Sequence, residues 1–241
     1  MDSPMIFVSE ITGTTVMIFL GLAVTIVGGA RGMSPIAGAA GWAAAVFLGA
    51  SLSDSSGAHM NPVITLAQVL SGRANWSLVP VYLSAQFAGA IVGALLAVVI
   101  LWPTIRANAD TTTTLGWFAT ASRNTKVWRS ILTECLATAV LVLWVLNPPQ
   151  PVVEDGVYNF GNSGLGYAGI AIVIFVLSLG AGSPTGAALN PVRDLGPRVV
   201  YTLLLRSHGP ANWSYAVVPI VGPVLGGLLA VAVSSALPIN S

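Results

Sequence analysis

Two short stretches, each with an asparagine followed by proline and valine, hold the residues best suited to chemistry in this sequence. Asn61 begins "NPV" within "HMNPVITL", and Asn190 begins "NPV" within "ALNPVRDLGP". Asn is a preferred N-cap and Pro is favoured at the first helical position, so each stretch predicts a helix start. A capping Asn accepts from the backbone with its side-chain oxygen, and its NH2 group keeps donors to spare.

Two such helix starts that meet end to end would direct both asparagine donors and both positive helix ends at one place. That combination suits a neutral molecule with acceptor oxygens, and it repels cations, including a hydrated proton. We therefore expect Asn61 and Asn190, with Val63 and Val192 beside them, to form a site for such a neutral molecule. The alternative for a single copy is an ordinary loop turn, and the second copy at an equivalent place argues against it.

The composition indicates which class of protein must position these residues. The chain has 241 residues, of which 55% are hydrophobic and only 7% are charged, whereas soluble domains average roughly 25% charged residues. This predicts an all-α membrane protein with several spans. The sequence shows no metal-ligand cluster, phosphate-binding loop, Ser-His-Asp set or basic cluster for nucleic acid, so we predict no enzyme, cofactor or metal. The single cysteine, Cys135, excludes an intramolecular disulfide.

A membrane-spanning helix needs about 20 mostly apolar residues. Six segments meet this requirement, at 6–28, 36–54, 79–101, 127–146, 167–183 and 213–236. The apolar segments after Asn61 and Asn190 run for only about 10 residues, or about 15 Å, which is half of a hydrocarbon core of about 30 Å. They predict two half-helices that meet at the midplane, where irregular backbone must be buried in protein or line a wet cavity.

Three landmarks recur in the same order in the two halves of the chain. They are "EITGT" and "ECLAT" at Glu10 and Glu134, the two "NPV" stretches, and "ANWS" at 74–77 and 211–214. This order predicts a duplicated unit, with repeat one at about 6–101 and repeat two at about 127–236 of a single channel domain, 1–241. Each unit has three spans, so the second inserts inverted, and such repeats commonly place a site at the midplane.

The stretches "SGAHMNPVITL" and "TGAALNPVRDLGPR" resemble the two signature loops of the aquaporin and aquaglyceroporin family, the major intrinsic proteins. The resemblance covers nearly the whole chain. It implies six transmembrane helices plus two re-entrant half-helices, a pore in each subunit and a homotetramer. It also implies a plasma-membrane location with cytoplasmic termini, although the charges of the loops favour the opposite orientation.

Within the family, Asp194, Arg198 and the pair Pro219-Ile220 resemble the marks of glycerol facilitators. The sequence departs from the family at Val63 and Val192, where Ala is usual. We expect conduction to survive this change with an altered pore width.

The resemblance implies a selectivity filter of four residues. Arg193, Ser178 and Ala187 occupy three positions, and the fourth is Gly41 or, with a slip of one residue, Trp42. With Gly41 the filter would be wide and would pass solutes larger or more polar than glycerol, such as undissociated lactic acid.

The resemblance also assigns supporting roles. It implies that Glu10 and Glu134 accept backbone N–H groups of the half-helix loops, with a proton relay as the alternative. His59 is expected to line the pore, and a pH gate is its alternative role. Asp194 and Arg198, four residues apart, are expected to pair and anchor a loop.

The function expected from these residues is passive conduction of small uncharged solutes, namely glycerol, similar polyols and water, without ions or protons. A proton- or ion-coupled secondary transporter remains the alternative, because inverted repeats and broken helices serve both classes. The loop at 147–164 would either gate the pore or merely connect two spans.

Overall fold

The computed structural model describes residues 2–108, 111–122, 126–148 and 166–236, which form helices and no strands. The α-helices are α1 (Ser3–Arg31), α2 (Pro35–Leu52), α3 (Pro62–Leu70), α4 (Val79–Ala107), α5 (Thr111–Phe118), α6 (Val127–Leu146), α7 (Gly166–Leu179), α8 (Pro191–Leu204) and α9 (Val218–Ala236). Four short 3-10 helices are η1 (Asp54–Ser56), η2 (Trp76–Leu78), η3 (Arg206–His208) and η4 (Trp213–Val217). Nearly all of the loop at 147–164 lies outside the described residues.

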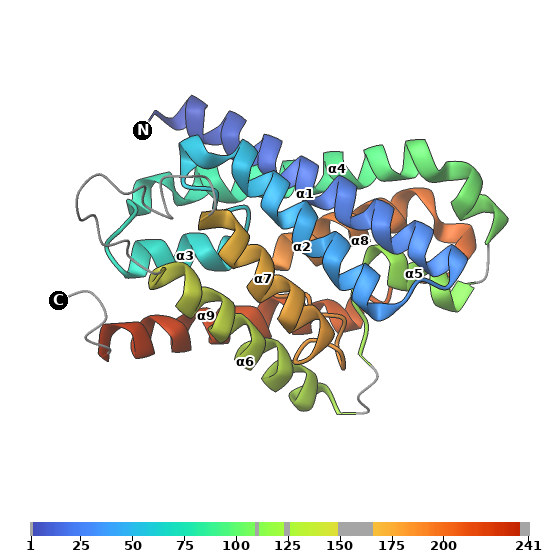
Figure 1. The fold of residues 1–241 in the computed structure, drawn as a ribbon. Coiled ribbons are helices and arrows are strands. Elements are labelled where there is room, and N and C mark those ends of the chain that lie inside the picture. The colour runs from blue at the N-terminus through green and yellow to red at the C-terminus, as the bar shows by residue number, and fades with distance from the viewer. Residues whose placement is uncertain (1, 109–110, 123–125, 149–165, 237–241) are drawn as a thin grey trace, which may run out of the picture.

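The helices α1, α2, α4, α6, α7 and α9 run through the bundle in alternating directions, and α1 begins and α9 ends at the same end of the molecule (Figure 1). Five described segments are long and apolar enough to span a membrane: α1, α2, α6, α4 with η2, and α9 with η4. The sixth, α7, has 14 residues and ends at Leu179, earlier than the expected span at 167–183. The all-α architecture and the six crossings agree with the prediction.

Large apolar side chains on the outer faces remain exposed in the isolated chain, for example Val99, Ile172 and Leu203. Helices that are apolar all round are typical of proteins whose outer surface faces lipid rather than water. The outside of this bundle therefore suits a hydrocarbon environment.

The helices α3 and α8 begin inside the bundle and run in opposite directions from their meeting point (Figure 1). α3 has 9 residues, close to the expected length, whereas α8 has 14 and is longer than expected. α3 packs against α9, α4 and α6, and α8 packs chiefly against α4. Each half-helix is thus held by long helices, some of which are distant from it in sequence.

Two helix pairs, α1 with α4 and α6 with α9, share the most extensive contacts, and glycines lie where they cross. A Cβ atom at Gly89 of α4 would lie 2.7 Å from the Ile11 carbonyl oxygen of α1. One at Gly222 of α9 would lie 3.0 Å from the Ile131 carbonyl oxygen of α6. Larger residues at these positions would force the helices apart.

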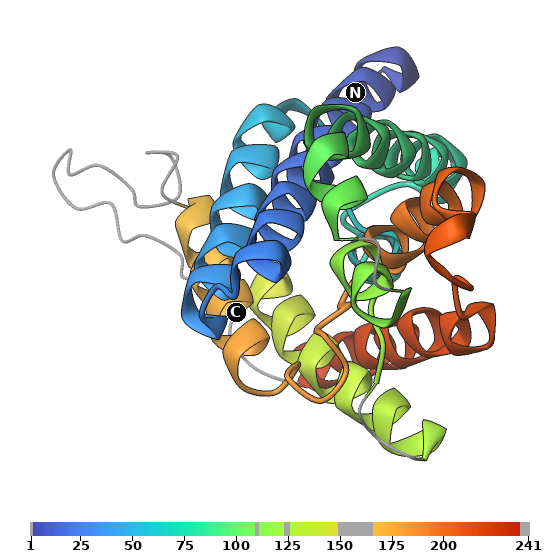
Figure 2. The same cartoon turned by 90° about the vertical axis from the view of Figure 1, so that its right-hand side faces the viewer.

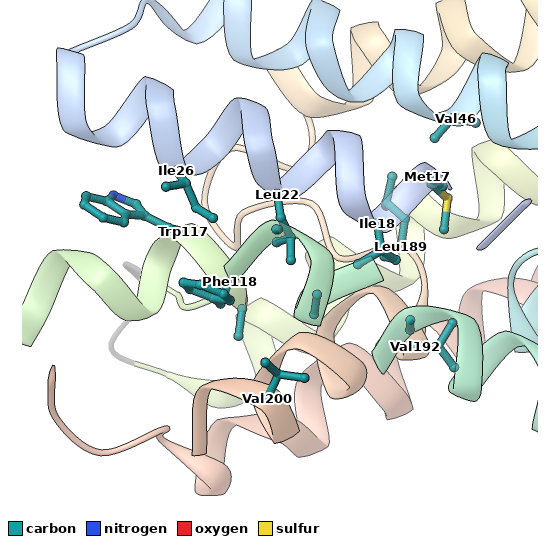
Figure 3. Packing of buried hydrophobic residues seen from close by; sticks show 14 of the residues in the cluster. Met17, Ile18, Leu22, Ile26, Val46, Trp117, Phe118, Leu189, Val192 and Val200 are labelled. Carbon is teal, nitrogen blue, oxygen red and sulfur yellow. The ribbon is translucent and has the colours of Figure 1, made fainter. Parts of the chain in front are cut away.

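The connection between α4 and α6 contains α5, a helix that the sequence patterns do not reveal. Figure 2 looks onto the end of the bundle that carries α5 and shows α8 between α4 and α9. α5 packs against α1 and α8. Its Phe118 lies near Leu22 of α1 and Val200 of α8 in the buried cluster (Figure 3). The helix α5 is therefore packed firmly against the bundle.

Candidate functional site: a polar cavity between two half-helices

A cavity of about 650 Å³ lies where the two half-helices meet. Its walls come from α1, α2, α6, α7 and from the loops that precede α3 and α8. The segment after α5 contributes as well. Polar groups in these walls include Asn61, Asn190, Arg193, His59 and Ser178. Most of the remaining lining is aliphatic.

Asn61 and Asn190 perform the same set of interactions from opposite sides. The Oδ1 atom of Asn61 accepts from the Val63 N–H at 2.9 Å, and that of Asn190 accepts from the Val192 N–H at 3.1 Å. Each asparagine therefore caps its half-helix. Because both helices start here, the positive ends of both helix dipoles face the same part of the cavity.

The amide nitrogens of this asparagine pair tie the two loops together. Asn61 Nδ2 donates to the Leu189 carbonyl at 2.9 Å, and Asn190 Nδ2 donates to the Met60 carbonyl at 2.8 Å. An NH2 group has two hydrogens, so each asparagine has one further hydrogen to offer a solute in the cavity.

The loops leading to the two asparagines share an unusual backbone. Ala58 and Met60 have φ of 54° and 49°, and Ala187 and Leu189 have φ of 51° and 54°. These positions lie three residues and one residue before each Asn. A non-glycine residue in the left-handed region costs roughly 1–2 kcal/mol, so the surroundings must hold these loops in place.

Glu10 of α1 holds the first loop. Its Oε1 atom accepts from the His59 N–H at 2.9 Å and from the Ser56 hydroxyl at 2.6 Å. Its Oε2 atom accepts from the Met60 N–H at 2.7 Å and from the Gln86 amide at 2.8 Å. Both carboxylate oxygens are thus fully engaged.

Glu134 of α6 makes the equivalent contacts with the second loop. Its Oε1 atom accepts from the Ala188 N–H at 3.0 Å and from the Thr185 hydroxyl at 2.5 Å. Its Oε2 atom accepts from the Leu189 N–H at 2.9 Å. In both loops the glutamate bonds two successive backbone N–H groups, the second belonging to the residue immediately before the capping asparagine.

Arg193, in the first turn of α8, contacts an aromatic ring in the cavity wall. Its Cζ atom lies 4.1 Å from the centroid of the Trp42 indole, in a cation–π contact. Its Nη1 atom donates to the Phe118 carbonyl at 3.3 Å. Ser178 and Ala187 line the same cavity, so the structure places four candidate filter residues around one space.

Gly41, the other alternative for the fourth filter position, lies outside this cavity. A Cβ atom on Gly41 would collide with Val24 of α1, and the residue borders a shallow apolar groove between α1 and α2. Successive residues on a helix point about 100° apart, and the Trp42 side chain therefore faces the cavity. A wide filter built on Gly41 is not compatible with this arrangement.

Val63 and Val192 also differ from expectation, because neither lines the cavity. Val63 is fully buried against α9, where a Cβ atom on Gly227 would overlap its Cγ1 atom. Val192 belongs to the buried cluster and lies near Leu189 (Figure 3). Their extra methyl groups fill packing space behind the pore wall, so the predicted change in pore width has no structural basis.

His59 lines the cavity and is held firmly. Its ring stacks on Tyr82 of α4 with centroids 4.2 Å apart, and Nδ1 lies 3.1 Å from the Thr65 hydroxyl. Tyr82 in turn donates to the Ser56 carbonyl at 2.6 Å. These contacts fix one face and one nitrogen of the imidazole.

Asp194 and Arg198 form a fully buried ion pair, with Nε and Oδ1 2.7 Å apart, behind the cavity wall. Asp194 Oδ2 accepts from the N–H of Thr120 at 2.7 Å and from its hydroxyl at 2.6 Å, and Arg198 Nη2 donates to the Thr120 carbonyl at 2.9 Å. Arg198 Nη1 also donates to the carbonyls of Ala211 and Asn212. The pair thus joins α8 to two surface loops.

The sequence patterns do not reveal three contacts near the filter: the Phe118 carbonyl, Thr120 and Thr25. A backbone carbonyl carries no residue-type signal, and Thr120 lies in a loop without periodicity. Thr25 is detectable, since it lies four residues from both Gly21 and Gly29 on one face of an otherwise apolar span. Within the described residues, no three His, Cys, Asp or Glu side chains are grouped to hold a metal ion.

Crossing apolar helices with two capped half-helices that meet in a polar cavity define a class of membrane proteins that form transmembrane pores. The family model described as "Major intrinsic protein" matches residues 3–234, and the chain belongs to this family.

Relatives and a solved structure extend the similarity over nearly the whole chain. The glycerol uptake facilitator protein of Streptococcus pneumoniae R6 is 35% identical over 238 residues, covering 94% of this chain and 96% of the relative. That of Bacillus subtilis is 35% identical over 230 residues, covering 92% and 80%. The aquaglyceroporin structure from Plasmodium falciparum has a TM-score of 0.82 at 26% identity and covers 96% of this chain and 95% of its own.

Proposed function

We propose that this protein is a passive membrane channel for glycerol, similar small polyols and water, and that it excludes ions and protons. The observation that carries this proposal is the reciprocal pair of Asn61 and Asn190. Each caps a half-helix and bonds the opposite loop, and each keeps a hydrogen for a solute oxygen. Two positive helix ends at the same place oppose the entry of cations.

The residues Trp42, Ser178, Ala187 and Arg193 form the selectivity filter in this proposal. The guanidinium of Arg193 donates to solute hydroxyls, and the Trp42 indole faces the carbon backbone of the solute. Ala187 is small, so the filter holds only one aromatic ring. This composition suits glycerol and somewhat larger neutral hydroxylated solutes, with undissociated lactic acid among them.

A coupled transporter is the competing function, and it would need a carboxylate free to bind or release an ion. The two buried glutamates have both oxygens occupied by donors. They act as supports for the half-helix loops, which favours the passive channel.

In this proposal the internal repeats, the oligomeric state and the membrane location are those of the family. The two halves of the chain are inverted repeats, as the equivalent roles of Glu10 and Glu134 suggest. Each subunit has its own pore, the assembly is a homotetramer, and it lies in the plasma membrane with cytoplasmic termini.

Proteoliposomes that contain a known amount of the purified protein test this proposal in an osmotic assay with water, glycerol, xylitol and lactic acid over a pH series. We expect fluxes that do not saturate at low concentration and do not need a proton gradient. Lactic acid flux should follow the undissociated fraction. Saturation, or solute accumulation driven by a proton gradient, would contradict the channel and support the transporter.

A variant at Ala187 tests the assignment of the selectivity filter. Ala187→Phe should reduce xylitol flux far more than water flux, because it adds a second ring to the constriction. Ala181→Phe introduces the same ring at an exposed turn position outside the cavity and should change neither flux. Equal large-solute flux in wild type and Ala187→Phe would remove Ala187 from the filter.

A further inference from the structure

One face of α1 carries three small or polar residues at intervals of four. Gly21, Thr25 and Gly29 lie in the sequence "GLAVTIVGG". Residues four apart lie above one another on a helix. All three therefore face the region between α2 and α5, next to the proposed filter. None of them bonds to Arg193.

The two glycines, Gly21 and Gly29, leave room for two indole rings to pack against α1. A Cβ atom on Gly21 would overlap the ring of Trp42, the filter residue on α2. One on Gly29 would overlap the ring of Trp117, at the end of α5. Trp117 is buried and lies beside Ile26 of α1 (Figure 3). The close approach of both rings depends on the absence of side chains at these two positions.

Between the glycines, the Thr25 hydroxyl reaches the same segment. Its Oγ1 atom lies 2.7 Å from the Trp117 carbonyl oxygen, compared with 3.1 and 3.2 Å to the carbonyls of Leu22 and Gly21 in its own helix. A hydroxyl has a single hydrogen, and the shortest distance indicates that it is directed at Trp117.

The segment that Thr25 holds is the one that contacts the filter arginine. The next carbonyl after that of Trp117 belongs to Phe118 and accepts from Arg193. Two residues further on, Thr120 is fixed by Asp194. The position of the Phe118 carbonyl is therefore fixed from two sides, by the bond of Thr25 to Trp117 and by the bonds of Asp194 to Thr120.

From this arrangement we infer that Thr25 is a positioning residue for selectivity: its hydroxyl fixes the segment 117–120 and thereby holds the Arg193 guanidinium against Trp42. This rests on the proposed function, because it assumes that Arg193 and Trp42 form the constriction. Without the hydroxyl, the Phe118 carbonyl is anchored from one side only. Arg193 then has more freedom, and the filter discriminates less by size.

The variant Thr25→Val tests this inference, because it keeps the branched shape and removes the donor. The measured quantity is the ratio of xylitol to glycerol permeability in the same proteoliposomes, which does not depend on how much protein is folded. We expect the ratio to rise by about three- to tenfold, the range that corresponds to the loss of one neutral hydrogen bond. Thr25→Ser retains the donor and should retain the wild-type ratio.

Thr15→Val is the matched control. Thr15 lies on the same helix, and its hydroxyl also donates to a backbone carbonyl of another element, that of Gly89 in α4 at 3.2 Å. Unlike Thr25, Thr15 does not line the cavity, so its variant reports on the packing of α1 alone. This variant should leave the ratio unchanged, whereas an equal rise in Thr15→Val and Thr25→Val would show a general loosening of α1 and overturn the inference.

An unchanged ratio in Thr25→Val, while wild type conducts glycerol, also overturns the inference and leaves the proposed function standing. Absence of glycerol flux in wild type contradicts the proposed function instead. If Thr25→Val does not yield folded protein, Gly29→Ala provides the test, because its added methyl displaces the Trp117 ring and with it the segment 117–120. A wild-type ratio in Gly29→Ala then refutes the inference.

Discussion

At the scale of single residues, chemistry at this site depends on which atoms face the cavity rather than on which residues are adjacent in sequence. Asn61 and Val63 are two positions apart, yet Asn61 lines the cavity and Val63 packs on Gly227 of α9. The same division separates Asn190 from Val192. The valines therefore belong to the packing of the bundle, and the asparagines to the lining of the cavity.

Val63→Ala should lower the stability of the protein and leave its permeability unchanged. The loss of two buried methyl groups opposite Gly227 leaves a void, for which we expect about 1–2 kcal/mol. Thermal unfolding in detergent and the osmotic assay measure the two effects. Val99→Ala, at an exposed position on the outside of α4, is the control and should alter neither. A changed glycerol-to-water ratio in Val63→Ala would show that this residue reaches the pore.

At the scale of elements, the half-helix α8 depends on its buried ion pair. Asp194 receives two bonds from Thr120 and two from Arg198. α8 is thereby connected to the segment after α5. In the sequence this segment cannot be distinguished from an ordinary loop. The i, i+4 spacing predicts the pair itself, but its partner Thr120 is distant in sequence and has no recognisable pattern.

Asp194→Ala should destabilise the protein by about 3–5 kcal/mol, because it leaves the Arg198 charge buried without a partner. The double variant Asp194→Ala with Arg198→Met removes both charges, and we expect it to be more stable than the single variant. Thermal unfolding measures both. Asp2→Ala removes an exposed carboxylate that makes no side-chain cap bond and is the control. A single variant as stable as wild type would contradict the role of the pair.

At the scale of the whole molecule, equivalent interactions in the two halves create the site. Glu10 and Glu134 each bond two successive N–H groups before a capping asparagine, and each asparagine bonds the loop of the other half. Neither half can form the midplane by itself, because each asparagine needs a carbonyl from the opposite loop.

Glu10→Gln and Glu134→Gln should therefore have similar effects. Each replaces one acceptor oxygen by an NH2 group that faces an N–H donor, a loss of about 1–3 kcal/mol. We expect a similar fall in the yield of folded protein for both variants, measured by size-exclusion chromatography. The molecules that do fold should show fluxes of neutral solutes independent of pH. Flux in wild type that requires protonation of either glutamate would contradict a purely supporting role.

The class of fold, the six crossings, the two capped half-helices and the asparagine pair could all be predicted from the sequence. These features follow from local rules: apolar length, the capping preference of Asn-Pro, and a repeated order of landmarks. Three features are visible only in the tertiary structure: that Trp42 rather than Gly41 lines the cavity, that both valines pack behind its wall, and that Thr25 is linked to Arg193 through Trp117 and Phe118. These features depend on helix rotation and on contacts between distant segments, and a one-residue shift turns a helical side chain by about 100°.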